Sequence, residues 1–132
     1  MKTIEVRSAA REELIDITAA VAGAVRESPV KNGLCLVFVP HTTAGILINE
    51  NADPDVKADL LLALRKSAPE DLPYGHGEGN SPAHVKACLT GSSVSVIIEN
   101  GRLALGTWQA VYFAEFDGPR RRLVHIAILG GS

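Results

Sequence analysis

The sequence has no long hydrophobic run. Its longest uninterrupted apolar stretch, "LCLVFV", falls far short of the roughly 20 residues that a helix needs to cross a bilayer. The first residues, "MKTIEVRSAAREE", also lack the apolar centre of a signal peptide. We therefore expect a cytoplasmic protein with no membrane partner.

An excess of positive charge is missing as well. The formal net charge is −2 at pH 7, whereas a protein that binds duplex nucleic acid usually presents a basic face. Nucleic acid is therefore not expected as a partner. The chain also lacks a Gly-x-Ser-x-Gly motif, a Cys–His pair and a dinucleotide glycine fingerprint. These absences disfavour serine or cysteine acyl transfer and nicotinamide chemistry.

Cysteine is scarce. Cys35 and Cys88 lie in the apolar segments "GLCLVF" and "VKACLTG", and we expect both to be buried free thiols in a reducing compartment. The chain has 132 residues, 46% of them hydrophobic, which is the size and composition of one soluble globular domain. We therefore treat residues 1–132 as a single domain.

The first third of the chain mixes strand and helix patterns. Alternation or continuous apolar character predicts strands at residues 3–8, 34–39 and 43–50. The second of these is apolar on both faces, which is typical of a central strand, and Pro40 ends it. Helical spacing from Thr18 predicts a helix that closes at Asn32-Gly33. Residues 12–17 fit either a strand or the approach to that helix.

Two further helices carry clear start signals. Asp53 is suited to cap a helix that Pro54 opens, and an apolar stripe follows at Val56, Leu60, Leu61 and Leu64. A shorter helix repeats this pattern, with Ser81 as the cap, Pro82 in the first position and Gly91 at the end. Val85 and Leu89 are expected to pack against the protein.

The last third resembles an antiparallel meander. Asn100-Gly101 predicts a hairpin between residues 94–99 and the long run 102–116, and Asp117-Gly118-Pro119 turns the chain into 120–129. Gly106 indicates a bulge or a close backbone approach. Together the elements predict an α+β fold, with a largely antiparallel or mixed β-sheet packed with two to three helices.

Three of the four histidines stand at places that can converge. His41 follows a buried strand, His76 lies in the irregular loop "YGHGEGNSPAH", and His84 falls in the first turn of a helix. Three imidazoles with an open fourth position suit a zinc-like ion and its bound water. Their spacing matches no short ligand signature, so each can equally be a hydrogen-bonded structural residue. His125 is expected in the core or at an interface.

Charged residues near the histidines have open roles. Glu78 is a candidate fourth ligand, a general base or a solvated loop charge. Glu115 lies among apolar residues, so it needs a partner, and one of the arginines at 120–122 is the natural candidate. Those arginines either line a solvated edge or hold a phosphate, and the N–H groups after Ser81 offer a second anion cradle. Trp108 either stacks on a heterocycle or packs in the core or an interface.

Four blocks in the chain resemble a known family. "PHTTAGILINENADPDV", "HGEGNSPAHVKA", "IENGRLALGTWQ" and "EFDGPRRR" are similar, in the same order, to the blocks of the YjbQ-like proteins. Members of that uncharacterised group are often labelled secondary thiamine-phosphate synthases. The resemblance covers about Val6 to Gly130, with small departures such as Gly75, where the family often has arginine.

The resemblance implies an α+β homotrimer with its histidine cluster at or near the subunit junction. It assigns His41, His76 and His84 to a metal or active-site group. The remaining site residues that it implies are Glu78, Asn80, Gln109 and Glu115 as catalytic candidates, Ser81 and Arg120 as phosphate contacts, and Trp108 as a stacking residue. The labelled reaction joins an aminopyrimidine diphosphate to a thiazole phosphate and releases pyrophosphate.

Three functional hypotheses follow. The first is a small enzyme with the labelled thiamine-phosphate synthase activity and a divalent metal at its site. Histidine ligands favour a zinc-like ion, whereas diphosphate departure favours magnesium. The second is a metal-dependent hydrolase of a small phosphorylated or carbonyl substrate, with Glu78 as base. The third is a non-catalytic trimer that binds a metal or a small anion.

Overall fold

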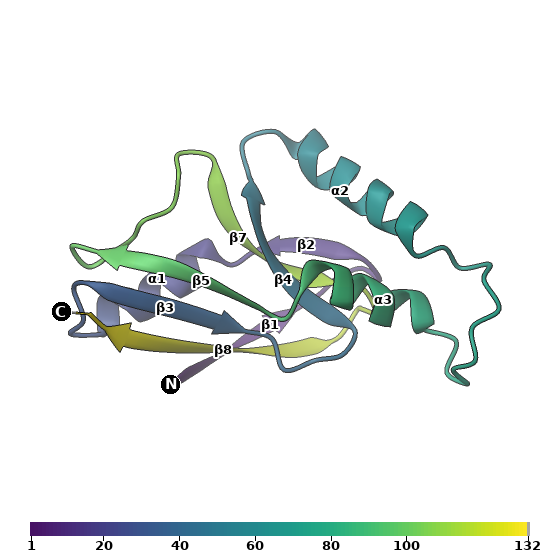
Figure 1. Cartoon of the computed structure of the whole chain (residues 1–132), viewed down its shortest axis with the longest axis horizontal. Helices are drawn as coiled ribbons and strands as arrows, with labels where there is room; N and C mark the ends of the chain where they lie inside the picture. The colour runs from purple at the N-terminus through teal and green to yellow at the C-terminus, as the bar shows by residue number, and fades with distance from the viewer. Residues whose placement is uncertain (132) are drawn as a thin grey trace.

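The computed structural model describes residues 1–131 of the chain. It contains two antiparallel sheets and three helices (Figure 1). Sheet A has the strand order β1-β8-β3-β5-β6 and sheet B the order β2-β7-β4. The strands are β1 (Lys2–Arg7), β2 (Glu13–Asp16), β3 (Gly33–Phe38), β4 (Ala44–Glu50), β5 (Ser93–Glu99), β6 (Arg102–Leu103), β7 (Gln109–Glu115) and β8 (Arg121–Gly130). The helices are α1 (Thr18–Glu27), α2 (Pro54–Ser67) and α3 (Ser81–Thr90).

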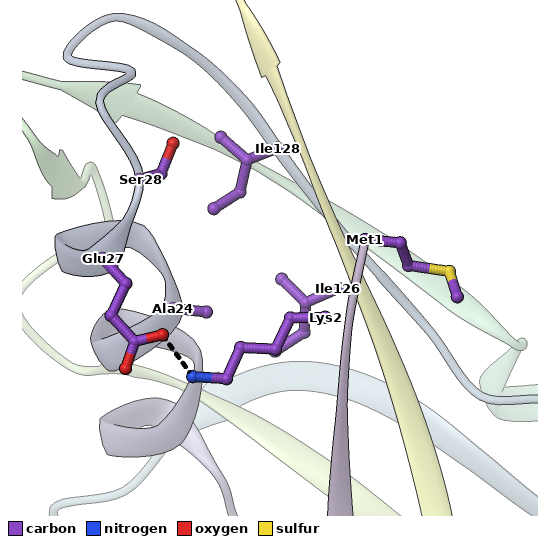
Figure 2. Close-up of a pocket in the computed structure, with 7 residues that line it drawn as sticks. All are labelled: Met1, Lys2, Ala24, Glu27, Ser28, Ile126 and Ile128. Carbon is purple, nitrogen blue, oxygen red and sulfur yellow. Dashed lines mark hydrogen bonds and ion pairs between the residues drawn. The ribbon is translucent and has the colours of Figure 1, made fainter.

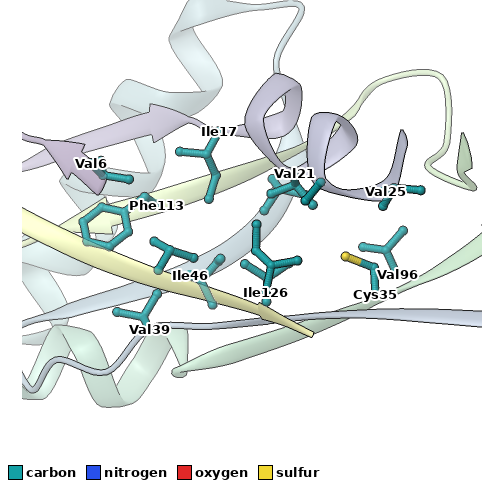
Figure 3. Close-up of a cluster of buried hydrophobic side chains, with 14 of the residues drawn as sticks. Val6, Ile17, Val21, Val25, Cys35, Val39, Ile46, Val96, Phe113 and Ile126 are labelled. Carbon is teal, nitrogen blue, oxygen red and sulfur yellow. The ribbon is translucent and has the colours of Figure 1, made fainter. Parts of the chain in front are cut away.

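The main core lies between the two sheets. Inward-facing residues of sheet A, such as Cys35 and Ile126, pack against Ile46 and Phe113 of sheet B (Figure 3). Helix α1 contributes Val21 and its apolar neighbours to the same cluster. Burial of apolar surface stabilises a fold by about 25 cal/mol per Å². This cluster, to which both sheets and α1 contribute, therefore stabilises the fold.

A second core covers the other face of sheet B. Tyr112 and Phe116 are buried there, and Leu60 and Leu64 of α2 pack against them together with Ala83 of α3. Because both faces of sheet B are covered, its middle strand β7 is buried along almost its whole length. The predicted α+β fold with largely antiparallel strands is confirmed. The strands form two sheets, whereas the prediction had one.

Most predicted elements are present, and residues 12–17 contain the strand β2. Helix α1 ends earlier than expected, at Glu27 instead of Asn32-Gly33. The reason is Pro29, because the residue before a proline is restricted to extended backbone, and Ser28 has φ −88° and ψ 144°. The Asp53 cap is confirmed, since its side chain accepts from the Asp55 N–H at 2.9 Å.

The predicted meander is wrong in one respect. Asn100 and Gly101 do form the β5–β6 hairpin, with φ values of +53° and +76° that fit its tight turn. The following run, however, leaves sheet A after Leu103 and continues in sheet B as β7. The turn at Asp117-Gly118-Pro119 then returns the chain to sheet A as β8. Gly106 lies in the connection, where its N–H donates to Gln109 Oε1 at 2.8 Å.

Several burial predictions also need correction. Strand β3 is central, but only Cys35 and Val37 face the core, while Leu34 and Phe38 are 44% and 41% exposed. On α3, Cys88 and Leu89 are exposed instead of buried, and the buried residues of this helix are Pro82, Ala83 and Lys86. Within residues 1–131 no helix is long and apolar enough to span a membrane.

Candidate functional site

Side chains from three separate stretches of the chain, residues 40–43, 76–84 and 117–122, line one cavity of about 410 Å³. His41 and two threonines come from the β3–β4 connection, and His76 and Glu78 from the glycine-rich loop. Asn80 and His84 come from the start of α3. We call this the histidine cavity; its lining residues are Pro40, His41, Thr42, Thr43, His76, Glu78, Asn80, His84, Asp117, Arg120 and Arg122.

A buried ion pair supports one wall of the histidine cavity. Glu115 is 0% exposed, and Arg122 donates to it through Nε (to Oε1, 2.9 Å) and Nη2 (to Oε2). Arg122 Nη2 also donates to Thr43 Oγ1 at 2.8 Å. The third nitrogen, Nη1, makes no hydrogen bond within the described chain. Arg122 is therefore held rigidly at the cavity wall, with its charge compensated by Glu115 and with Nη1 as the donor that remains without a partner in the described residues.

Glu115 has the arginine partner that the sequence predicted, at Arg122. Its carboxylate also accepts from Ser8 Oγ at 2.8 Å and from the Asp117 N–H at 3.0 Å. Burial raises the pKa of Glu115, but the hydrogen bonds from Arg122, Asp117 and Ser8 outweigh burial and hold the pKa below its ordinary value. With four donors on one buried carboxylate, the geometry favours a positioning role over the acid or base role considered from the sequence.

His41 is fixed by the main chain. Its Nε2 accepts a hydrogen bond from the Leu123 N–H at 2.9 Å, so this nitrogen carries no proton and the neutral ring is protonated at Nδ1. Burial and the neighbouring charge of Arg122 lower the pKa of His41 below 6.5. His41 is therefore a neutral donor at physiological pH, with Nδ1–H as its available polar group.

His76 and His84 lie side by side. Their ring centroids are 5.2 Å apart and the rings meet edge to face. The prediction that the loop brings His76 and Glu78 towards His84 and His41 is thus met by the arrangement of the cavity. The glycines in the loop leave space around it, since a Cβ on Gly75 or Gly77 would meet nothing within 4 Å.

The residues do not fit a three-histidine metal set. Within residues 1–131 no group of three or more histidine, cysteine, aspartate or glutamate side chains is arranged to hold a metal ion. His41 explains why: metal ligation uses an imidazole lone pair, and the Nε2 lone pair already accepts the Leu123 N–H. Nδ1, the other nitrogen, carries the proton.

Asn80 lines the cavity, and its amide oxygen is buried without a hydrogen-bond partner within residues 1–131. Its Nδ2 donates to Asp117 Oδ2 at 2.9 Å. This contact fixes the orientation of the amide, because the flipped amide would place Oδ1 against the carboxylate oxygen of Asp117. Arg120 donates to the same carboxylate oxygen at 3.1 Å. Asn80 Oδ1 is buried and has no partner in the described part of the chain. A buried acceptor without a donor is costly, and a bound molecule with an N–H or O–H group would satisfy it.

The remaining predicted site residues lie elsewhere. Ser81 is the first residue of α3 and not its cap, and it does not line the cavity. The expected anion cradle is reduced, because Pro82 has no N–H and the Ala83 N–H donates to Asn80 O at 3.0 Å. Gln109 begins β7 and Glu115 ends it, a separation of about 20 Å at 3.3 Å per residue. Trp108 adjoins Gln109 and is 62% exposed.

A second hollow adjoins the histidine cavity and was not predicted from the sequence. This apolar hollow, about 450 Å³ in volume, shares His41, Thr42 and His84 with the cavity. Its other lining residues are small, namely Ala44, Ala87, Cys88, Gly91 and Ser92. His84 and Cys88 are four residues apart on α3 and therefore lie on the same face of the helix. This face of α3 therefore borders both the polar histidine cavity and the mainly apolar hollow.

Comparisons with known proteins agree over the whole described chain. The sequence model of the family described as "UPF0047 protein YjbQ-like" matches residues 2–131. A UPF0047 protein of Methanocaldococcus jannaschii is 51% identical over 96% of this chain and 91% of its own length. YugU of Bacillus subtilis is 49% identical, over 98% of this chain and 99% of its own.

Solved structures show the same fold. A crystal structure of an uncharacterized YjbQ/UPF0047 protein from Clostridium acetobutylicum has a TM-score of 0.95 and 54% identity, covering 98% of this chain and 100% of the other. A protein of unknown function from Sulfolobus solfataricus has a TM-score of 0.94 and 35% identity, covering 98% of this chain and 96% of the other.

Proposed function

The chain belongs to the YjbQ-like UPF0047 family, and we propose that it is an enzyme whose histidine cavity binds a small phosphorylated substrate. The convergence of Arg122 with His41, His76 and His84 on one cavity carries this proposal. A guanidinium held in place by one carboxylate can still donate to a phosphate oxygen through its remaining nitrogen, and imidazoles accept or donate protons near neutral pH. Such a site suits a reaction in which a phosphate or diphosphate group departs.

The reaction we propose is the one that the resemblance implies. An aminopyrimidine diphosphate loses pyrophosphate when its carbon–oxygen bond breaks, and the cationic pyrimidine then joins the thiazole phosphate. The charge to be stabilised develops on the departing diphosphate. Arg122 is placed to contact that charge, and Arg120 at the cavity rim is a second contact. His76 or His84 would supply a proton to the leaving oxygen.

The apolar hollow suggests where the organic part of the substrate lies. It shares His41 and His84 with the histidine cavity, so a molecule with a phosphate group and an apolar or heterocyclic body can occupy both. Asn80 Oδ1 would accept a hydrogen bond from an amino or hydroxyl group of that molecule. This combination fits a phosphorylated heterocycle better than inorganic phosphate alone.

The proposal has a direct activity test. Purified protein is incubated with the two thiamine precursors and magnesium, and pyrophosphate release is measured. His76→Ala and His84→Ala should lower the rate by about 100-fold or more if the rings transfer protons. Lys66→Gln is the control, since Lys66 lies on α2, outside the cavity and outside the strip of sheet A proposed for subunit contact. No pyrophosphate release, or equal loss in all variants, would contradict the proposal.

The metal-dependent hydrolase considered from the sequence stays a prediction that the geometry does not favour, because within residues 1–131 no three side chains of the ligand types, His76, His84 and Glu78 included, are arranged to hold a metal ion. It requires a zinc-like ion, and elemental analysis of protein purified without a nickel column tests for it. About one transition-metal ion per chain, lost in His76→Ala and His84→Ala, would favour the hydrolase. Absence of the ion would leave the histidines as proton-transfer or phosphate-binding groups.

We also propose that the protein forms the homotrimer that the resemblance implies. An apolar strip on the outer face of sheet A supports this: Leu34 pairs with Ile97 on one side and Leu129 on the other, and the last two are 60% and 57% exposed. Phe38 continues the strip and stacks on His125. Apolar strips of this kind are commonly covered by another subunit. Light scattering of Ile97→Glu should show dissociation to smaller species.

A further inference from the structure

The largest hollow described on the chain lies away from the histidine cavity and shares no lining residue with it. It has a volume of about 670 Å³ and runs between α1 and the β5–β6 hairpin. Arg26 of α1, Lys31 from the following loop and Arg102 of β6 line it, and no aspartate or glutamate does. We call it the basic groove.

None of the three basic side chains of the groove forms an ion pair in the described structure, and Glu27, the carboxylate beside Arg26, is itself paired with Lys2. Eight of the 13 lysine and arginine side chains form an ion pair with a carboxylate in the described structure, and three of the remaining five line this groove. Placing like charges together without a counter-ion is unfavourable. A bound anion would offset that repulsion, so the groove has the electrostatic character of a ligand site.

A neighbouring groove on the other side of α1 provides the contrast. It is lined by Lys2, Glu27, Ile126 and a few other residues, and Lys2 points at Glu27 across it (Figure 2). The two side chains form an ion pair, so this groove is neutral. The difference between the two grooves is therefore the missing carboxylate.

The basic groove also has an apolar floor and a fixed rim. Ala22, Leu103 and Leu105 supply apolar surface, and the other uncharged lining residues are small or polar. Lys31 is held along the hairpin turn, because the Gly101 N–H donates to its carbonyl oxygen at 2.9 Å. A Cβ on Gly101 would lie 3.3 Å from Lys31 Cδ and 3.5 Å from its Nζ. Glycine at this position thus lets the lysine stem lie over the turn.

We propose that the basic groove is a second binding site, for a small organic phosphate that carries an apolar or aromatic body. The phosphate contacts Arg26, Lys31 and Arg102, and the body packs on Leu103 and Leu105. The volume lies within the range of small-molecule sites, about 300 to 1,000 Å³. This site is independent of the reaction proposed for the histidine cavity.

The test is an NMR titration of ¹⁵N-labelled protein with phenyl phosphate, with phenol and inorganic phosphate as separate arms. Phenyl phosphate should shift the amide signals of Ala22 to Arg26 and of Gly101 to Leu105. Phenol should leave those signals unchanged, and inorganic phosphate should shift them only at higher concentration. The position of the shifted signals separates this site from the histidine cavity.

Paired variants complete the test. Arg26→Gln/Arg102→Gln should weaken phenyl phosphate binding at the groove by about 10-fold or more. Lys57→Gln/Lys66→Gln removes the same charge from α2, outside the groove, and should change the affinity by less than about twofold. The inference is overturned if phenyl phosphate shifts no groove signals, if phenol binds equally well, or if both double variants weaken binding equally.

Discussion

Glu115 and Arg122 form a buried ion pair that joins the end of sheet B to sheet A beside the histidine cavity. The side chains of Arg122 and Glu115 are 4% and 0% exposed. Desolvating two charges is costly, and hydrogen bonds from Ser8 and the Asp117 N–H help to offset that cost. The pair therefore links the packing of the fold to the electrostatics of the site.

Removing one charge of this pair should destabilise the protein. Glu115→Gln nearly preserves shape but leaves the Arg122 guanidinium buried without a counter-ion. We expect the free energy of unfolding to fall by about 3–5 kcal/mol, measured by urea denaturation. Glu99→Gln, on the exposed side of β5 and outside any ion pair of the described chain, serves as the control and should change little. A loss as small as that of the control would mean that the pair contributes nothing to stability.

The same carboxylate predicts a specific loss of stability in acid. The pKa of Glu115 is lowered in the folded protein, so the unfolded chain binds a proton at higher pH than the folded one. This contribution is complete well above the ordinary value of 4.5 and is lost as the pH falls through the lower folded pKa. Urea midpoints should therefore fall steeply below about pH 4.5, and less steeply in Glu115→Gln. Parallel curves for the two proteins would contradict this linkage.

His41 should remain neutral at pH 7. Burial and Arg122 lower its pKa, and Leu123 N–H donates to Nε2. Long-range ¹H–¹⁵N NMR should show a midpoint below 6.5 and the proton on Nδ1, with His41→Ala used to assign the signal. A midpoint at or above 6.5, or a proton on Nε2, would show that the ring is held differently and would reopen the metal-ligand role.

Gly45 sets the distance between β4 and the end of α3. A Cβ there would lie 2.1 Å from Thr90 Oγ1 and 2.8 Å from Gly91 O, which is a backbone atom. Gly45→Ala should therefore displace the end of α3 and lower the free energy of unfolding by about 1–3 kcal/mol. Gly77→Ala, with nothing within 4 Å of its added Cβ, is the control for thermal denaturation. Equal stability of the two variants would rule out the close contact.

Cys88 reports on the apolar hollow. It is exposed and lines the hollow, whereas Cys35 is 0% exposed and burial raises the pKa of its thiol. A maleimide should therefore label only Cys88 in the folded protein. A phosphorylated heterocycle should slow labelling, whereas pyrophosphate should slow it less because it leaves the hollow open. Equal protection by both would indicate that the hollow takes no part in binding.

Local signals predicted much of the fold. Asp53 and Pro54 mark the start of α2, and Asn100-Gly101 marks the hairpin, because capping and tight turns depend on a few adjacent residues. The division into two sheets was not predicted, since nothing local in residues 102–116 indicates that the chain leaves one sheet for the other. Sheet membership depends on long-range packing.

The sequence predicted several of the residues that line the site, but it did not predict how their side chains are held. Residue type and position predicted that His41, His76 and His84 meet, and they line one cavity. Sequence did not predict that a main-chain N–H occupies His41 Nε2, because Leu123 lies on a distant strand. Gln109 was grouped with the site through family blocks alone, and it begins β7 at the end away from the cavity, next to Trp108.

The most direct test of the central claim is an NMR titration of the chelator-treated protein with pyrophosphate. We expect saturable shifts in the segment from His76 to His84 and around Leu123, retained in Lys66→Gln and strongly weakened in His84→Ala and Arg120→Gln. Such a result would establish a phosphate site that needs no transition metal. Absence of shifts in that segment, or shifts equal in every variant, would contradict the assignment of the histidine cavity as the phosphate-binding active site.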